Sequence, residues 1–306
     1  MEFLRHSFVL TGPTASGKTV LALEMADKLH AEIICMDSMT LYRQMDIGTA
    51  KPTPEQRMLI PHHLLDVLNP DQSSNVAWWL EEAAAAANSL LGRGKTPLFV
   101  GGTPLYLKAL LFGLFPLDGI NQEQTRLIEN EFENCPSQEL HLRLSERDPQ
   151  SASKIHPNDR KRVVRALVVH KVTGRPISEH QRQWNDNNSR PQLLGKGRCI
   201  WLQVPRQELY RRIHERTAQA LKNGWVDEAK SLLNNFHAWS REATEAIGYK
   251  EIFDFLTRGG DLRQVEEQIN LRTRHFAKHQ ETWFRHLPNC QGVSEESKPD
   301  LWIEFL

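Results

Sequence analysis

The chain has 306 residues, a formal net charge of zero, 40% hydrophobic residues and 25% charged residues. This composition is that of a folded globular protein with a sizeable core, and it excludes fibrous, disordered and membrane-spanning chains. The zero net charge argues against a dedicated nucleic-acid binder. Four scattered cysteines, Cys35, Cys135, Cys199 and Cys290, form no C-x-x-C pair and predict free thiols. We expect a cytoplasmic protein, because the first strand begins too early for a signal peptide.

A complete G-x-x-x-x-G-K-[ST] pattern lies between an expected strand at Ser7–Leu10 and an expected helix at Lys18–Leu29. Its glycines let successive N–H groups point at one anion, and the helix N-terminus adds the positive end of its dipole. We expect Lys18 to reach the terminal phosphates and the Thr19 hydroxyl to hold Mg²⁺. The pattern predicts a polyphosphate site formed by Gly12, Pro13, Thr14, Ala15, Ser16, Gly17, Lys18 and Thr19.

Strands and helices continue to alternate through the first third of the chain. Further strands are expected at Glu32–Met36 and Pro97–Val100, with helices at Asn75–Leu91 and Leu105–Phe112. The segment Leu41–Asn69 contains several prolines and is expected to be irregular. The alternation indicates a mostly parallel sheet that is covered on both faces.

The pattern changes after Leu117. Helical periodicity without a strand runs from Asn121 to His180, and one further strand is expected at Arg198–Val204. Helices are then expected at Glu208–Asn223, Trp225–Phe236, Ala246–Leu256 and Gln264–Arg285. These elements predict an α/β fold. A P-loop NTPase-like parallel-sheet core, residues 1–118 and 190–306, is interrupted by a helical insertion domain at 119–189.

Asp37 follows the second expected strand, and ligands of open α/β sheets bind beyond the carboxyl ends of the strands. The carboxylate is therefore expected beside the phosphate loop, either as a water-mediated Mg²⁺ ligand or as a general base. The third strand ends in Gly101-Gly102-Thr103, where many ATPases carry a metal-supporting carboxylate. A small polar loop and one carboxylate suit a diphosphate leaving group better than hydrolysis by water.

Basic residues gather in three segments despite the zero net charge. Between Lys154 and Arg182 there are eight Lys and Arg against two Asp and Glu, and further runs lie at 206–216 and 272–286. One such run is usually a solvated helix face. Three in a phosphate-binding chain favour a polyanionic partner. His62-His63 and Trp78-Trp79 show no metal spacing and are interpreted as packing residues.

Several longer motifs resemble those of the tRNA dimethylallyltransferases, also called tRNA isopentenyltransferases, of the bacterial type. The sequence given lacks the C-terminal zinc finger of eukaryotic relatives. Besides the phosphate loop, the resemblance rests on Asp37-Ser38 with Tyr42, Met45–Pro52, Pro61–Asp66, Val100–Tyr106, Ile155–Asp159 with Arg162 and Arg165, Ala246–Glu251, and Thr273-Arg274 with Lys278–Arg285. These motifs span almost the whole chain in the order of the family.

The resemblance implies transfer of a dimethylallyl group from dimethylallyl diphosphate to N6 of an adenine. That adenine lies immediately 3′ of the anticodon in tRNAs that read codons beginning with uridine. The phosphate loop would hold the diphosphate of the prenyl donor, with Mg²⁺ on Thr19. By resemblance, Asp37 is the general base, Thr103 orients the adenine and Arg216 contacts the diphosphate. The base is expected to flip out of its stack to be reached.

The resemblance also implies a monomer that grips the anticodon stem-loop between the core and the insertion. It places tRNA contacts at Asp37, Ser38, Met39, Thr40 and Thr103, at Lys161, Arg162, Val163, Val164 and Arg165, at Glu245, Ala246, Ile247, Gly248, Tyr249 and Lys250, and at Lys278, His279, Gln280, Glu281, Thr282, Trp283, Phe284 and Arg285. Pro116–Gly119 lacks a proline that is usual in the family. A nearby arginine contact would fall on Thr125 or Arg126.

Two other functions remain open on the residues alone. A nucleoside or nucleotide kinase would use the phosphate loop for ATP and Asp37 as its base, but the Met45–Pro52 motif and the basic insertion would then have no role. A non-enzymatic RNA-binding protein with a nucleotide switch is disfavoured by the zero net charge and by the number of site-type residues.

Overall fold

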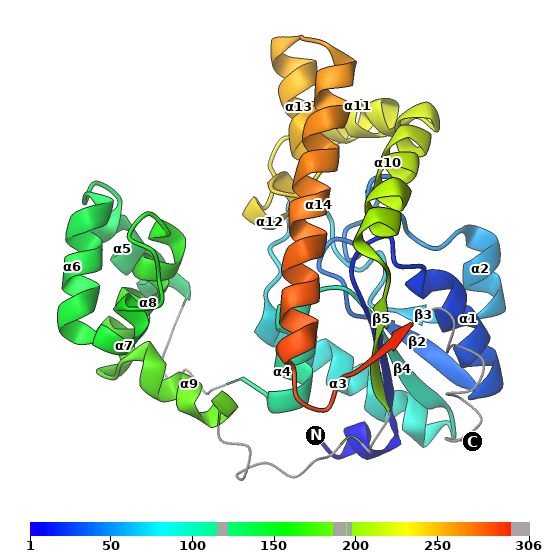
Figure 1. Ribbon diagram of the computed structural model, residues 1–306, viewed down its shortest axis with the longest axis horizontal. Coiled ribbons are helices and arrows are strands. Elements are labelled where there is room, and N and C mark those ends of the chain that lie inside the picture. Colours follow the sequence, from blue (N-terminus) through cyan, green and yellow to red (C-terminus); the bar gives the residue numbers. More distant parts are fainter. Residues whose placement is uncertain (115–121, 186–193, 195–197, 295–306) are drawn as a thin grey trace. The chain divides into compact units, whose positions relative to one another are not determined.

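The computed structural model describes residues 1–114, 122–185, 194 and 198–294. The chain divides into two compact units, Met1–Leu111 with Gln192–Leu306 and Phe112–Pro191, and each is treated by itself. The expected boundaries at 118/119 and 189/190, and the Pro116–Gly119 departure, lie outside the described residues. Figure 1 shows the elements of both units.

The first unit contains a six-stranded sheet in which every pairing is parallel. The strand order is β3-β2-β4-β1-β5-β6. The strands are β1 (Phe8–Thr11), β2 (Ala31–Cys35), β3 (His62–His63), β4 (Thr96–Gly101), β5 (Cys199–Gln203) and β6 (Gln291–Ser294). The predicted α/β fold with a parallel sheet is confirmed.

The central strands are buried because helices cover them. All residues of β1 and β2 are buried, as expected for short apolar strands of a parallel sheet. Helices α1 (Lys18–Lys28) and α3 (Val76–Gly92) pack on β2 and β4, and α4 (Pro104–Phe112) follows β4 directly. Because β1 lies beside β4 and β4 beside β2, the loops after these three strands meet at one edge.

A group of helices follows β5 in the first unit. It comprises α10 (Arg206–Lys222), α11 (Trp225–Asn235), α12 (Arg241–Thr244), α13 (Tyr249–Arg258) and the long α14 (Leu262–His286). Helix α14 packs against α10 and α13, and α11 against α13 (Figure 1). Val204, Leu209, Ile213 and Ala277 form an apolar cluster that joins α10 to α14.

Three local predictions are wrong. The expected Ala246–Leu256 helix begins only at Tyr249, because Gly248 has φ +94° and forms the N-cap of α13. The segment expected to be irregular contains α2 (Pro54–Leu59), which begins with a capping box at Thr53, and the edge strand β3. Strand β6 and the short 3-10 helix η1 (Glu2–His6) were not expected either, since four- or five-residue elements leave little periodicity.

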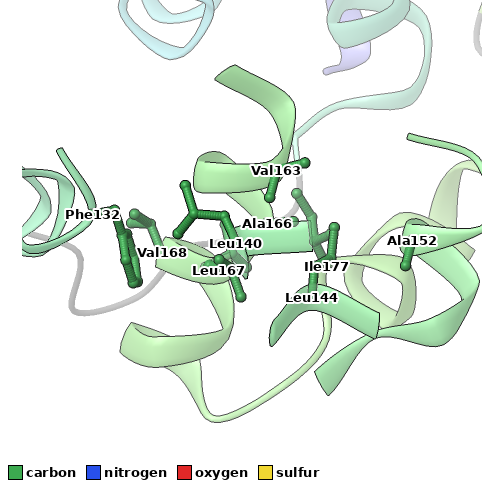
Figure 2. Packing of buried hydrophobic residues seen from close by; sticks show 10 residues of the cluster. Phe132, Leu140, Leu144, Ala152, Val163, Ala166, Leu167, Val168 and Ile177 are labelled. Atoms are coloured by element: carbon green, nitrogen blue, oxygen red, sulfur yellow. The ribbon is translucent and has the colours of Figure 1, made fainter. Parts of the chain in front are cut away.

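The described residues of the second unit form helices joined by short loops, with no strand among them. It contains α5 (Gln122–Phe132), α6 (Ser137–Arg147), α7 (Pro149–Ala152), α8 (Arg160–Thr173) and α9 (Ile177–Asn185). Its apolar core gathers side chains such as Leu140, Leu144 and Val163, all fully buried (Figure 2). Arg160 donates hydrogen bonds to the carbonyl oxygens of Phe132, Glu133 and Cys135, at and just after the end of α5, and so ties α8 to α5.

Candidate active site

The phosphate loop follows β1 and leaves several polar groups without protein partners. Gly17 has φ +84° and is the N-cap of α1, a conformation that favours glycine. Among the described residues, the backbone N–H groups of Gly17, Lys18 and Thr19 have no hydrogen-bond partner. The Ser16 hydroxyl is fully buried and also unpaired. Orphaned donors at a helix N-terminus form an anion site.

Three charged side chains act on one another beside this loop. The Lys18 ammonium folds back and donates to the carbonyl oxygens of Gly12 and Pro13, at 2.9 and 2.7 Å. Burial lowers the pKa of Lys18 to about 8, while Asp37 opposes the shift and Arg216 adds to it. Burial also lowers the pKa of Arg216, and Asp37 again opposes the shift. Two cations and one carboxylate, all half-buried, thus lie close enough to influence one another's charge.

Asp37 and Thr103 lie on neighbouring loops that are tied together. The Thr103 hydroxyl accepts a hydrogen bond from the Ser38 N–H at 3.1 Å, and the Thr103 N–H donates to the Met36 carbonyl oxygen at 3.3 Å. One Asp37 carboxylate oxygen accepts from the Met39 N–H at 2.9 Å, which fixes the side chain in a turn. Asp37 is half-buried, so its carboxylate keeps access to solvent or to a ligand.

Gln280 of α14 connects the phosphate loop to the loop after β4. Its Oε1 accepts a hydrogen bond from the Thr14 N–H at 2.9 Å, and its Nε2 donates to the Gly102 carbonyl oxygen at 2.6 Å. The side chain is 1% exposed. The apolar cluster of α10 and α14 also packs against Ala15 of the phosphate loop. Helix α14 therefore supports the loop by a polar and an apolar contact.

The Met45–Pro52 loop is held by contacts within the protein. Lys51, whose side chain is 1% exposed, donates to Asp46 at 2.7 Å, to Asp66 at 2.5 Å and to the Tyr42 carbonyl oxygen at 2.5 Å. The Glu228 carboxylate accepts from the Asp46, Ile47 and Gly48 N–H groups and from the Tyr249 hydroxyl. A Cβ on Gly48 would lie 2.2 Å from Trp225, so a larger residue does not fit.

The contacts between Glu228 and the Met45–Pro52 loop were not predicted from the sequence. Glu228 lies about 180 positions from the loop it holds, and no spacing rule connects the two. The Met45–Pro52 motif indicated that this loop has a role in the family. It did not indicate that α11 and α13 hold the loop in place. Only the fold brings these segments together.

The helical stretches predicted to contact tRNA contain both exposed and buried residues, because successive side chains of a helix point in different directions. On α14, Lys278, His279, Thr282 and Arg285 are exposed, whereas Gln280, Glu281 and Phe284 are buried and Trp283 is half-buried. In 245–250, Glu245 is exposed, while Ala246, Gly248 and Tyr249 are buried. The exposed members remain predictions.

The insertion segment shows the same division. On α8, Lys161, Arg162 and Arg165 are exposed, Val163 is buried in the core and Val164 is half-buried. Arg162 forms an ion pair with Asp159, which also caps α8. The Arg126 side chain lies outside the described residues, and Thr125 is half-buried.

His63 and Trp79, both expected to pack, have identifiable partners. The His63 ring contacts the Glu32 carboxylate at 2.7 Å, between β3 and β2. Burial alone would raise the pKa of Glu32, but hydrogen bonds from His63 and Arg93 outweigh it and lower that pKa. Trp79 is fully buried and stacks on Tyr106, with ring centroids 4.5 Å apart.

Neither a preformed metal cluster nor a membrane-spanning helix occurs among the described residues. No cluster of three or more His, Cys, Asp and Glu side chains there could hold a metal ion by itself. No helix among them is both long enough and apolar enough to cross a bilayer.

Comparison with known proteins places this geometry in a family. A family model described as IPP transferase matches residues 40–287. The chain belongs to the IPP transferase family. It is 40% identical over 285 residues to a tRNA dimethylallyltransferase of Geobacter sulfurreducens, covering 93% of this chain and 90% of the relative. It is 41% identical over 283 residues to that of Thermotoga neapolitana, covering 92% and 90%.

Solved structures agree with this family assignment. The full-length tRNA isopentenylpyrophosphate transferase of Bacillus halodurans is 36% identical, with a TM-score of 0.67, and the match covers 94% of this chain and 90% of that one. A eukaryotic dimethylallyltransferase described as acting on tRNA is 27% identical, with a TM-score of 0.76, and the match covers 95% and 74%. Both matches therefore extend over more than nine-tenths of this chain.

Proposed function

We propose that this chain is a tRNA dimethylallyltransferase. It transfers the dimethylallyl group of dimethylallyl diphosphate to N6 of the adenine 3′ of the anticodon, in tRNAs that read codons beginning with uridine. The observation that carries the proposal is the meeting of an anion loop, one carboxylate and the Thr103 loop at the ends of β1, β2 and β4. We also propose that it acts as a cytoplasmic monomer.

In the proposed reaction the allylic carbon–oxygen bond of the donor breaks, and diphosphate leaves with the electron pair. The phosphate loop, Lys18 and Arg216 stabilise the negative charge that builds on this leaving group. A bond forms between the adenine N6 and the allylic carbon, and the Asp37 carboxylate takes the N6 proton. Thr103 orients the flipped adenine through its hydroxyl.

Thr19, exposed in the first turn of α1, is the proposed Mg²⁺ ligand beside diphosphate oxygens and water. Such sharing is typical of Mg²⁺, which keeps several waters and binds through substrate phosphates. The unpaired Ser16 hydroxyl and free amides of the loop fit a bound anion with its cation. When bound, the ion supplies positive charge that stabilises the departing diphosphate.

Incubation of the purified protein with labelled dimethylallyl diphosphate, unmodified tRNA and Mg²⁺ tests the proposal. We expect label in the tRNA on one adenosine next to the anticodon, without ATP. Phosphate transfer from ATP to an acceptor, with no prenylated tRNA, would instead establish the kinase function. Binding of tRNA without either transfer would establish the non-enzymatic alternative.

A further inference from the structure

Gln280 lies at a buried position, where a polar side chain destabilises the fold unless each of its polar atoms has a hydrogen-bond partner. It is 1% exposed on α14, and both ends of its amide are used, the acceptor by the Thr14 N–H and the donor by the Gly102 carbonyl oxygen. A side chain chosen for packing alone would be Leu or Met. A neutral side chain that accepts at one end and donates at the other is Gln or Asn.

The two loops approach each other closely beside Gln280. A Cβ on Gly102 would lie 2.6 Å from Gln280 Nε2, 3.2 Å from the Gly12 carbonyl oxygen and 3.7 Å from Lys18 Nζ. The phosphate loop and the loop after β4 therefore touch at Gly102. A small displacement of either loop breaks at least one of the two Gln280 hydrogen bonds.

These two loops carry opposite halves of the proposed reaction. The phosphate loop holds the leaving diphosphate, and the Gly101-Gly102-Thr103 loop continues into Thr103, which binds the Ser38 N–H beside Asp37. The distance between donor and acceptor thus depends on how the loops are fixed to each other. A misplacement of about 1 Å in such a pair can reduce turnover roughly 10²-fold.

We infer that Gln280 is a positioning residue that holds the phosphate loop and the Gly101-Gly102-Thr103 loop in register for transfer. The inference rests on the proposed prenyl transfer. It gives the inward face of α14 a role distinct from that of the exposed residues beside it, such as His279 and Thr282, which remain predicted tRNA contacts.

The test is Gln280→Met, which keeps the volume and removes both hydrogen bonds. The matched control is Ile269→Ala, which weakens the same helix at a buried apolar position about three turns earlier. For Gln280→Met we expect kcat to fall roughly 10–100-fold, while KM for tRNA changes less than about threefold. Amide exchange measured over residues 12–17 should accelerate at Thr14 by at least about tenfold, because Thr14 loses its acceptor.

The control separates positioning from general destabilisation. Ile269→Ala should lower Tm and leave both kcat per folded molecule and exchange in residues 12–17 near wild type. Equal kcat values for the two variants would overturn the inference. Unchanged exchange in residues 12–17 of Gln280→Met would do the same. Exchange needs no turnover, so a wild-type protein without prenyl transfer would reject the proposed function while this readout still tests the contact.

Discussion

Lys18 and Lys51 both belong to sequence motifs, but their contacts in the structure differ. The Lys18 ammonium bonds to carbonyl oxygens of its own loop, and among the described residues it has no carboxylate ion pair. Lys51 binds Asp46, Asp66 and a carbonyl oxygen. The phosphate loop keeps donors free for a ligand, whereas the Met45–Pro52 loop uses its donors to hold the protein together. Unsatisfied polar groups thus distinguish a binding motif from a supporting one.

The largest effect on turnover is expected from a change at the proposed ligand site, beside the phosphate loop. Asp37→Ala should lower turnover by about 10²–10⁴, because the adenine amine loses its proton acceptor. Binding of tRNA should persist. Single-turnover prenyl transfer measures the first quantity and filter binding the second, with the exposed Asp71→Ala as the control. Near-normal turnover would remove Asp37 from the base role.

A change in the Met45–Pro52 loop is expected to lower the stability of the fold. Lys51→Met removes the shared partner of Asp46 and Asp66. Asp46 is exposed and Asp66 keeps its ion pair with Arg57, so we expect the free energy of unfolding to fall by about 1.5 kcal/mol. Prenyl transfer per folded molecule should stay near wild type. Urea unfolding followed by tryptophan fluorescence measures the change, and the exposed Lys95→Met is the matched control. A strong loss of turnover at unchanged stability would instead assign Lys51 to ligand binding or catalysis.

The lowered pKa of Lys18 predicts a pH dependence on the ligand side. The free protein holds this group near a pKa of about 8, and a bound anion favours its charged form. Above pH 8 binding must therefore take up a proton, and the affinity for pyrophosphate should fall by up to about tenfold per pH unit.

Calorimetry at pH 7, 8 and 9 measures this dependence. Lys18→Arg keeps its charge over the whole range, so it reports the titration of pyrophosphate itself. The difference between the two proteins isolates Lys18. Identical pH profiles would show that Lys18 does not titrate in the binding reaction.

The smallest effect extends the comparison to the second unit. Arg162→Ala and Arg165→Ala should each weaken tRNA binding and reduce the slope of log K against log salt concentration by about one per lost phosphate contact. Titrations at several salt concentrations measure that slope, with the exposed Arg147→Ala as the control. An unchanged slope would return this part of α8 to an ordinary solvated face.

Much of the fold could be predicted because its signals are local. The glycine pattern fixed the position of the phosphate loop, and apolar runs predicted β1, β2, β4 and β5 to within one residue at each end. Strands β3 and β6 were missed because they are short and lie at the edges of the sheet. The start of α13 was missed because the conformation of Gly248 depends on Trp225, which fills the space a side chain would need.

The sequence by itself determined the anion loop, the strand-end position of Asp37 and the family resemblance, since each depends on neighbouring residues or on a motif. The tertiary structure decided which polar groups are already paired. It placed Gln280 between two loops that lie 178 and 266 positions away along the chain, and it placed Glu228 against a loop about 180 positions away. Hydrogen bonding is short-ranged in space and indifferent to sequence separation, so these roles appear only when the chain is folded.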